Sequence, residues 1–173
     1  MKDATQVVSA FLAELPNVIA AELPAILAVR SARQSKPDGS YVTRGDLLVQ
    51  ELILSHIRKH LPHAIIVSEE MALPVAPGED CIIVVDPIDG TENFTSGLPE
   101  WGVSVASYDQ GNHVASLLGC PEMNVWLRSG MILPRFTSRI RGLSSSLSRE
   151  DILSVIPGHE YRIVGCCVYN MIK

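Results

Sequence analysis

Acidic residues gather where two apolar segments of the sequence end. The segment 64–67 (AIIV) is followed after one serine by Glu69 and Glu70, and the segment 82–85 (IIVV) is followed by Asp86 and Asp89. If the two segments are neighbouring strands, three or four carboxylates meet, and like charges in a partly dry site disfavour each other's ionisation. A hard divalent cation removes this conflict, because Mg²⁺ binds carboxylate, carbonyl and water oxygens. The spacing therefore indicates a site for Mg²⁺.

The residues around the two aspartates add further groups suited to phosphate chemistry. Pro87 has no backbone N–H and a fixed φ, which helps to aim the carbonyl of Ile88 inward as an oxygen ligand. Gly90 permits a tight backbone and Thr91 brings a hydroxyl, while residues 90–94 (GTENF) can open a helical turn whose N–H groups suit a phosphate oxygen. Metal, anion cradle and hydroxyl together indicate phosphoryl transfer to water.

Each of these residues taken alone has a simpler interpretation. An aspartate after a strand is usually a turn or cap residue, and Asp46 lies at capping-box spacing from Thr43. Lys36 alone is a surface charge. Only the combination of acids outweighs these interpretations. We expect no zinc site from the histidines, which are scattered without evident cysteine or acid partners: His56, His60, His63, His113 and His159.

Composition limits the class of protein. The chain has 173 residues, 47% of them hydrophobic, and a net charge of −5, which argues against a nucleic-acid polymer as ligand because phosphates repel an acidic surface. The four cysteines form no C-x-x-C pair and no secretory signal is evident, so we expect a cytoplasmic protein with reduced thiols. No uninterrupted apolar run approaches ~18 residues, and we expect no membrane span.

The order of the predicted elements gives the fold class. Residues 3–36 are apolar at helical spacing, and Pro16 and Pro24 predict two separate helical pieces; residues 43–62 predict a further helix. Strands are predicted in 63–70, 81–86, 101–109, 113–120 and 124–130, a capped helix in 142–157, and a strand leading into a helix in 161–173. This is an α+β protein with N-terminal helices over an antiparallel sheet (1–130) and an incomplete C-terminal α/β layer (131–173).

The motifs resemble those of the inositol monophosphatase family, which are lithium-sensitive, Mg²⁺-dependent phosphomonoesterases. The resemblance runs over about residues 36–130, in the order KPDGSYVTRGD, SEE, DPIDGTENF, GLPEWGVSVA and GNHVASLLGCPEMNVWLRSG. It implies a layered αβαβα sugar-phosphatase-type fold, two or three Mg²⁺ ions with Mn²⁺ as a substitute, a small phosphate ester as substrate, and a homodimer.

The resemblance also implies residue roles. It makes Glu69 a catalytic residue and a ligand of the first metal, and Asp86 the carboxylate that bridges two metals. The further metal ligands would be the Ile88 carbonyl and Asp89. Asp46 and Thr91 would orient and deprotonate the attacking water. The remaining roles are the amides of Gly90 and Thr91 for the phosphate, and Lys36 as a peripheral charge.

The sequence departs from the family pattern at its C-terminal side. Family members continue into a W-D-x-A-A-like segment with another metal-binding aspartate, and Cys166 stands where small or hydroxylated residues are usual. We therefore expect a truncated family member, and two functions stay open: a phosphomonoesterase, or a catalytically weak metal-binding remnant that acts as an interaction or assembly module. A haloacid-dehalogenase-like mechanism is discarded, because it needs D-x-D and the aspartates here are three apart.

Overall fold

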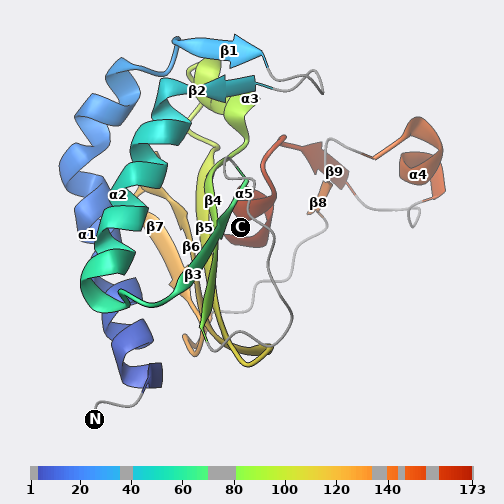
Figure 1. Cartoon of the computed structure of the whole chain (residues 1–173). Helices are drawn as coiled ribbons and strands as arrows, with labels where there is room; N and C mark the ends of the chain where they lie inside the picture. Colours follow the sequence, from blue (N-terminus) through green and yellow to red (C-terminus); the bar gives the residue numbers. More distant parts are fainter. Residues whose placement is uncertain are drawn as a thin grey trace.

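A five-stranded mixed sheet lies at the centre of the molecule (Figure 1). The computed structural model describes residues 4–35, 41–69, 81–133, 140–143, 147–154 and 160–172. The strand order is β3-β4-β5-β6-β7, in which β3 and β4 are parallel and the other neighbours antiparallel. The strands span Ile65–Ser68, Ile82–Asp89, Gly102–Asp109, Asn112–Cys120 and Val125–Arg128, with a short 3₁₀ turn, Pro121–Met123, before the last. The five predicted strands are confirmed, and the meander carries one parallel edge strand.

Two helices cover one face of this sheet. Figure 1 shows α1 (Ala4–Ala28) and α2 (Arg44–His60) side by side against it. A small antiparallel pair, β1 (Arg33–Ser35) and β2 (Tyr41–Thr43), lies between them in the sequence. The helix predicted in 43–62 is confirmed. Its inner face joins the main core, whose fully buried side chains include Phe11, Leu15, Ile53, Ile57, Ile83 and Trp101.

The prediction of two N-terminal helical pieces is wrong, because α1 runs through both Pro16 and Pro24. Each proline removes one backbone hydrogen bond and costs about 3 kcal/mol in a helix interior. The helix nevertheless presents one buried stripe to the core, and each such side chain contributes roughly 1.5–3 kcal/mol. Tertiary packing thus outweighs local propensity along this stripe, which comprises Val8, Phe11, Leu12, Leu15, Ile19 and Ile26.

By length and composition, α1 is also apolar enough to cross a membrane, which a search for uninterrupted apolar runs missed. Within Thr5–Ala28 an 18-residue window has a mean hydropathy of 1.5, and 28% of that window is buried in the structure. A helix that packs on a protein core meets the same criterion, and α1 contributes six core side chains. Hydropathy by itself is therefore weak evidence for a membrane span here.

The C-terminal part begins a second layer of strands and helices. β8 (Ile140–Leu143) and β9 (Glu160–Ile163) are parallel, with α4 (Arg149–Ser154) between them in the sequence and α5 (Cys167–Ile172) after them. The predicted cap of α4 is present, since the Asp151 N–H donates to Ser148 Oγ at 3.1 Å and the Ser148 N–H donates to Asp151 Oδ2 at 2.9 Å. In Figure 1, α5 lies across the central sheet from α1 and α2, where Val168 packs with Cys120 and Cys166.

Candidate metal and phosphate site

The parallel edge of the sheet brings the two acidic segments together, as predicted. Ser68 of β3 pairs with Val85 of β4, and the Glu69 N–H donates to the Val85 carbonyl at 3.4 Å. The next residue on each segment is an acid, so Glu69 lies beside Asp86 where the parallel pairing of β3 with β4 ends. Glu69 is exposed and Asp86 half-buried. A carboxylate from each strand therefore meets at this edge.

A β-bulge puts Asp86 and Asp89 on the same face of the sheet. Residues three apart on a regular strand point to opposite faces, because side chains alternate. Here Asp86 pairs with Ser104 and Asp89 with Gly102, so three steps along β4 match two steps along β5. The extra residue restores a common face, and Pro87 is tolerated inside the bulge because its missing N–H interrupts no ladder bond there.

Asp46 faces the same site from the first turn of α2. Its Oδ2 accepts hydrogen bonds from the Thr43 N–H at 2.8 Å and from the Thr43 hydroxyl, and its own N–H donates to Thr43 Oγ1 at 3.2 Å. The other oxygen, Oδ1, lies 3.5 Å from the Thr91 hydroxyl. Asp46 is 2% exposed. The capping box is confirmed, and the same carboxylate also turns one oxygen toward Thr91.

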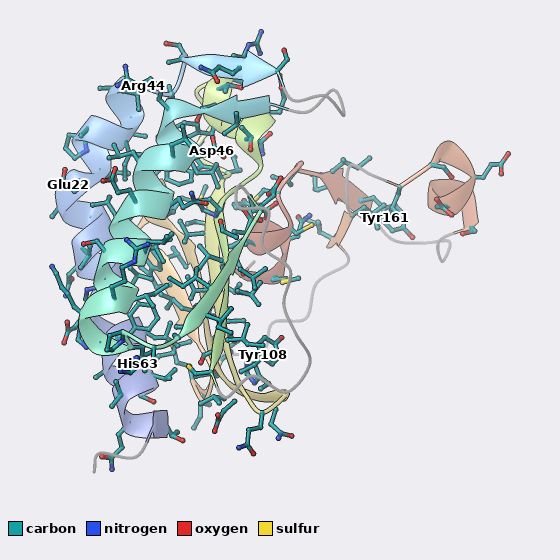
Figure 2. The ribbon with its side chains drawn as sticks, viewed as in Figure 1. Glu22, Arg44, Asp46, His63, Tyr108 and Tyr161 are labelled. Atoms are coloured by element: carbon teal, nitrogen blue, oxygen red, sulfur yellow. The ribbon has the colours of Figure 1, made fainter. Side chains whose placement is uncertain are left out.

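Aromatic packing holds α3 (Thr91–Thr95) against the start of α2. Phe94 stacks edge-on with Trp101, with ring centroids 5.1 Å apart, and both side chains are fully buried. A Cβ on Gly45 would come within 2.6 Å of the Phe94 ring, so only glycine permits this approach of the two helices. The approach carries Thr91 to Asp46, which Figure 2 shows near the N-terminal end of α2.

Thr91 and Gly90 form the joint between β4 and α3. The Thr91 hydroxyl has two acceptors in reach, Asp46 Oδ1 and the Ile88 carbonyl at 3.1 Å, so it can donate to either. Gly90 precedes α3 with φ +82°, in the left-handed region that favours glycine. The turn places the start of α3 directly after Asp89, as the sequence predicted.

Asp89 receives partners from a segment far along the chain. Its Oδ2 accepts hydrogen bonds from the Val168 N–H and, at 3.2 Å, from the Cys166 thiol. The Cys166 sulfur in turn accepts the Tyr169 N–H at 3.2 Å, as an N-cap serine oxygen would. Burial, opposed by the Tyr169 hydrogen bond, raises the pKa of Cys166, so the thiol keeps its proton and can donate it. Cys166 stands where the family usually has a small or hydroxylated residue, and its thiol makes the hydrogen bonds that a hydroxyl would make there.

The sequence analysis found Thr43 by its spacing from Asp46 but missed two neighbours of the site, Asn93 and Val168. Thr43 buttresses Asp46, and the capping-box spacing was a signal for it. Asn93 ties the site to the C-terminal segment by donating to the Glu100 carbonyl at 2.7 Å and to the Val164 carbonyl. The contact of Val168 with Asp89 had no local signal. Two predicted positions, Lys36 and Glu70, lie outside the described residues.

The donor set fits a hard divalent cation. Glu69, Asp86 and Asp89 supply carboxylate oxygens and Ile88 a carbonyl, and all four lie at the end of the parallel pair β3–β4. Both described partners of the Asp89 carboxylate fall on Oδ2. Oxygen ligands without nitrogen or sulfur are typical of Mg²⁺, Mn²⁺ or Ca²⁺ sites.

The sequence profile of the "Inositol monophosphatase family" matches residues 3–151. A Salmonella typhimurium protein named "Nus factor SuhB" is 33% identical over 108 residues, which are 62% of this chain and 40% of that protein. A Mesorhizobium japonicum "Inositol-1-monophosphatase" is 33% identical over 89 residues, 51% of this chain and 34% of that one. The matches thus span about two-fifths or less of these curated relatives.

Solved structures show the same fold. A structure described as an IMPase/NADP phosphatase with NADP and Ca²⁺ superimposes with a TM-score of 0.81, covering 98% of this chain and 71% of that one at 16% identity. A structure of an IMPase/NADP phosphatase with Mg²⁺ and phosphate superimposes with a TM-score of 0.78, covering 97% of this chain and 70% of that one. The sequence identity of this structure and of a further IMPase/NADP phosphatase structure to this chain is 15–16%. The layered α+β fold is therefore that of the structures described as IMPases. The chain belongs to the inositol monophosphatase family.

Proposed function

We propose that this chain is a Mg²⁺-dependent phosphomonoesterase that hydrolyses a small phosphate ester with water as the nucleophile. The observation that carries the proposal is the β-bulge, which turns Asp86 and Asp89 to one face at the edge where Glu69 ends the parallel strand. The resemblance to structures described with Mg²⁺ and phosphate, or with Ca²⁺ and NADP, supports the same chemistry.

The protein's own groups account for water activation. A water that donates to Thr91 Oγ1 passes its proton to that oxygen while the Thr91 hydroxyl proton moves to Asp46 Oδ1, 3.5 Å away. Asp46 Oδ2 already accepts two hydrogen bonds from Thr43, so the carboxylate is fixed in place and its other oxygen, Oδ1, faces Thr91. Positioned general bases of this kind contribute typically 10²–10⁴-fold to the rate.

The remaining residues would hold the metal and the phosphate. Glu69, Asp86, Asp89 and the Ile88 carbonyl would bind the Mg²⁺ ions, which lower the pKa of bound water and neutralise charge on the phosphate and leaving oxygens. The amides of Gly90 and Thr91 would donate to the phosphate. Lys36 would add a peripheral positive charge. We place the protein in the cytoplasm, with a homodimer as its expected assembly.

A second function is favoured by the names of several relatives and by exposed apolar side chains. The Salmonella relative is named a Nus factor rather than a phosphatase. After β7, Met131, Ile132 and Leu133 are 50%, 98% and 47% exposed. A metal-binding protein of low turnover that serves as an interaction or assembly module would fit these observations. Both functions require metal binding, so turnover separates them.

The test is phosphate release by the purified 173-residue chain. The substrates are myo-inositol 1-phosphate, fructose 1,6-bisphosphate and adenosine 3′,5′-bisphosphate, each with and without Mg²⁺ and with added Li⁺. Asp89→Asn removes one ligand charge and should abolish turnover while the protein stays folded. Asp109→Asn, in the exposed turn at the far end of β5, is the matched control and should keep wild-type activity.

The outcomes separate the two functions. Mg²⁺-dependent release that is inhibited by Li⁺ and lost in Asp89→Asn supports the phosphomonoesterase. Mg²⁺ binding without release on any substrate supports the assembly module. Unchanged Mg²⁺-dependent activity in Asp89→Asn would refute the assignment of the site.

A further inference from the structure

A second cluster of metal-binding side chains joins α1 and α2 at the end far from Asp46. Glu14 of α1 faces His56 and His60, which lie one helical turn apart on α2. The Glu14 carboxylate lies 3.2 Å from His60 Nε2 and 3.8 Å from His56 Nε2. One ligand atom from each of the three side chains lies within 4.8 Å of the others. The expectation that the histidines lack an acidic partner is therefore wrong for this pair.

These separations are close to those of a tetrahedral metal site. Zinc bonds to histidine nitrogen and carboxylate oxygen are about 2.0–2.2 Å long, so neighbouring ligand atoms lie roughly 3.4 Å apart. The distances of 3.2 and 3.8 Å from the carboxylate bracket that value. The third separation, between the ligand atoms of His56 and His60, is no more than 4.8 Å.

Nε2 of His56 is a buried nitrogen without a hydrogen-bond partner among the described residues. The His56 side chain is 7% exposed, and within the described residues no hydrogen bond reaches its Nε2. A backbone hydrogen bond with Phe11 acts to raise the pKa of His56. A proton on Nδ1 leaves the lone pair on Nε2, which is the tautomer that binds a metal. A buried polar nitrogen without a partner is costly unless something binds it.

The His56 ring is buried and lies against other rings. Burial, followed by the charge of His60, lowers the pKa of His56, against the opposing effects of Phe11 and Glu14. Ring contacts fix the geometry: Phe11 lies 5.4 Å from the His56 ring and 6.3 Å from the His60 ring, centroid to centroid.

We propose that Glu14, His56 and His60 form a binding site for a Zn²⁺-like transition-metal ion that clamps α1 to α2. Two histidines and one carboxylate suit Zn²⁺ and its neighbours, whereas Mg²⁺ prefers an all-oxygen site. Glu14 is 57% exposed, so water can take the fourth position and the ion can enter from solvent. At 1.5 Å per residue, His56 lies about 15 Å along α2 from Asp46, so the clamp is separate from the phosphate site.

The first measurement starts from the chain stripped of metals. Saturating Mg²⁺ is added to occupy the site at Glu69, Asp86 and Asp89, and Zn²⁺ is then titrated in. Wild type should bind one Zn²⁺, and Co²⁺ in its place should give the visible absorption of a tetrahedral nitrogen–oxygen site. His60→Ala and Glu14→Gln, at the more exposed ligands, should each weaken Zn²⁺ binding by at least roughly 100-fold, since loss of mere supporting groups costs 10–100-fold.

Two matched variants control for charge and for surface histidine. Glu22→Gln removes another exposed acid of α1, and His63→Ala removes an exposed histidine just beyond α2 (Figure 2); both should bind Zn²⁺ like wild type. Zn²⁺ should also raise the Tm of wild type and of these two controls, but not of His60→Ala. Equal Zn²⁺ affinity in His60→Ala and wild type, or no bound Zn²⁺ in wild type, would overturn the clamp. Asp89→Asn should keep this Zn²⁺ site. A failure of the Zn²⁺ proposal can therefore be distinguished from a failure of the phosphatase proposal.

Discussion

The glycine between Asp89 and Thr91 offers the sharpest test of how the site is built. Gly90 has φ +82°, and an added Cβ would lie 2.9 Å from Cys166 Cβ and 3.1 Å from the Gly165 carbonyl oxygen. The variant Gly90→Ala therefore meets two penalties. A non-glycine residue in the left-handed region costs about 1–2 kcal/mol, and overpacking a well-packed position costs about 1–3 kcal/mol more.

Gly130 separates these two penalties. It has φ +83°, nearly the same as Gly90, but a Cβ there would meet nothing within 4 Å. Gly130→Ala should lose only the conformational part, about 1–2 kcal/mol. Gly90→Ala should lose about 2–5 kcal/mol in all, a large share of a typical stability of 5–15 kcal/mol. The difference, about 1–3 kcal/mol, measures the docking of the C-terminal segment on the site.

Urea unfolding at 25 °C, followed by tryptophan fluorescence, gives both free energies of unfolding with comparable m-values. Because Cys166 donates to Asp89, Gly90→Ala should also disturb the Asp89 carboxylate, and Gly130→Ala should not. Equal losses of stability in the two variants would refute the reasoning, since the close contact with Cys166 and Gly165 would then carry no energy.

Two further predictions concern the C-terminal segment. Cys166→Ser should retain the N-cap of α5 and the donor to Asp89, whereas Cys166→Ala should lose both and cost about 1 kcal/mol in urea unfolding; equal stability of the two variants would contradict the cap. Hydrogen bonds from Ser148 lower the pKa of Asp151 below its usual 3.8. The Asp151 carboxylate therefore stabilises α4 fully above pH 3.8, and this stabilisation is lost as the pH falls through the lower pKa of the folded state. Hydrogen exchange of the α4 amides should show this loss in wild type and not in Asp151→Asn.

Much of the fold followed from local patterns. The strand runs, the turn between β5 and β6, and the helix from Arg44 all lay where alternation and capping predicted them. The capping boxes at Thr43–Asp46 and Ser148–Asp151 are set by residues three apart, so sequence spacing suffices to find them. The chemistry of the acids at the strand ends was visible for the same reason, because strand ends bring neighbouring segments to one edge.

The remainder depended on contacts between distant residues. Pro16 and Pro24 predicted a broken helix, yet burial of one apolar stripe keeps α1 continuous, and no local signal reports how much surface a helix buries. The histidine pair was visible one turn apart on α2, but its acid comes from α1. Spacing within a segment cannot reveal a partner supplied by another element.

The sequence by itself determined which chemical groups this protein has at its site: carboxylates, a carbonyl after proline, a glycine turn and a threonine hydroxyl in one short motif. Only the tertiary structure decided how they face one another. The bulge in β4 turns Asp86 and Asp89 to one side, and Gly45 against Phe94 brings Asp46 to Thr91. Cys166 and Val168 engage Asp89 from 77 and 79 residues away. The physical reason is that residue type fixes charge and hydrogen-bonding capacity, whereas packing of the whole chain fixes direction and distance.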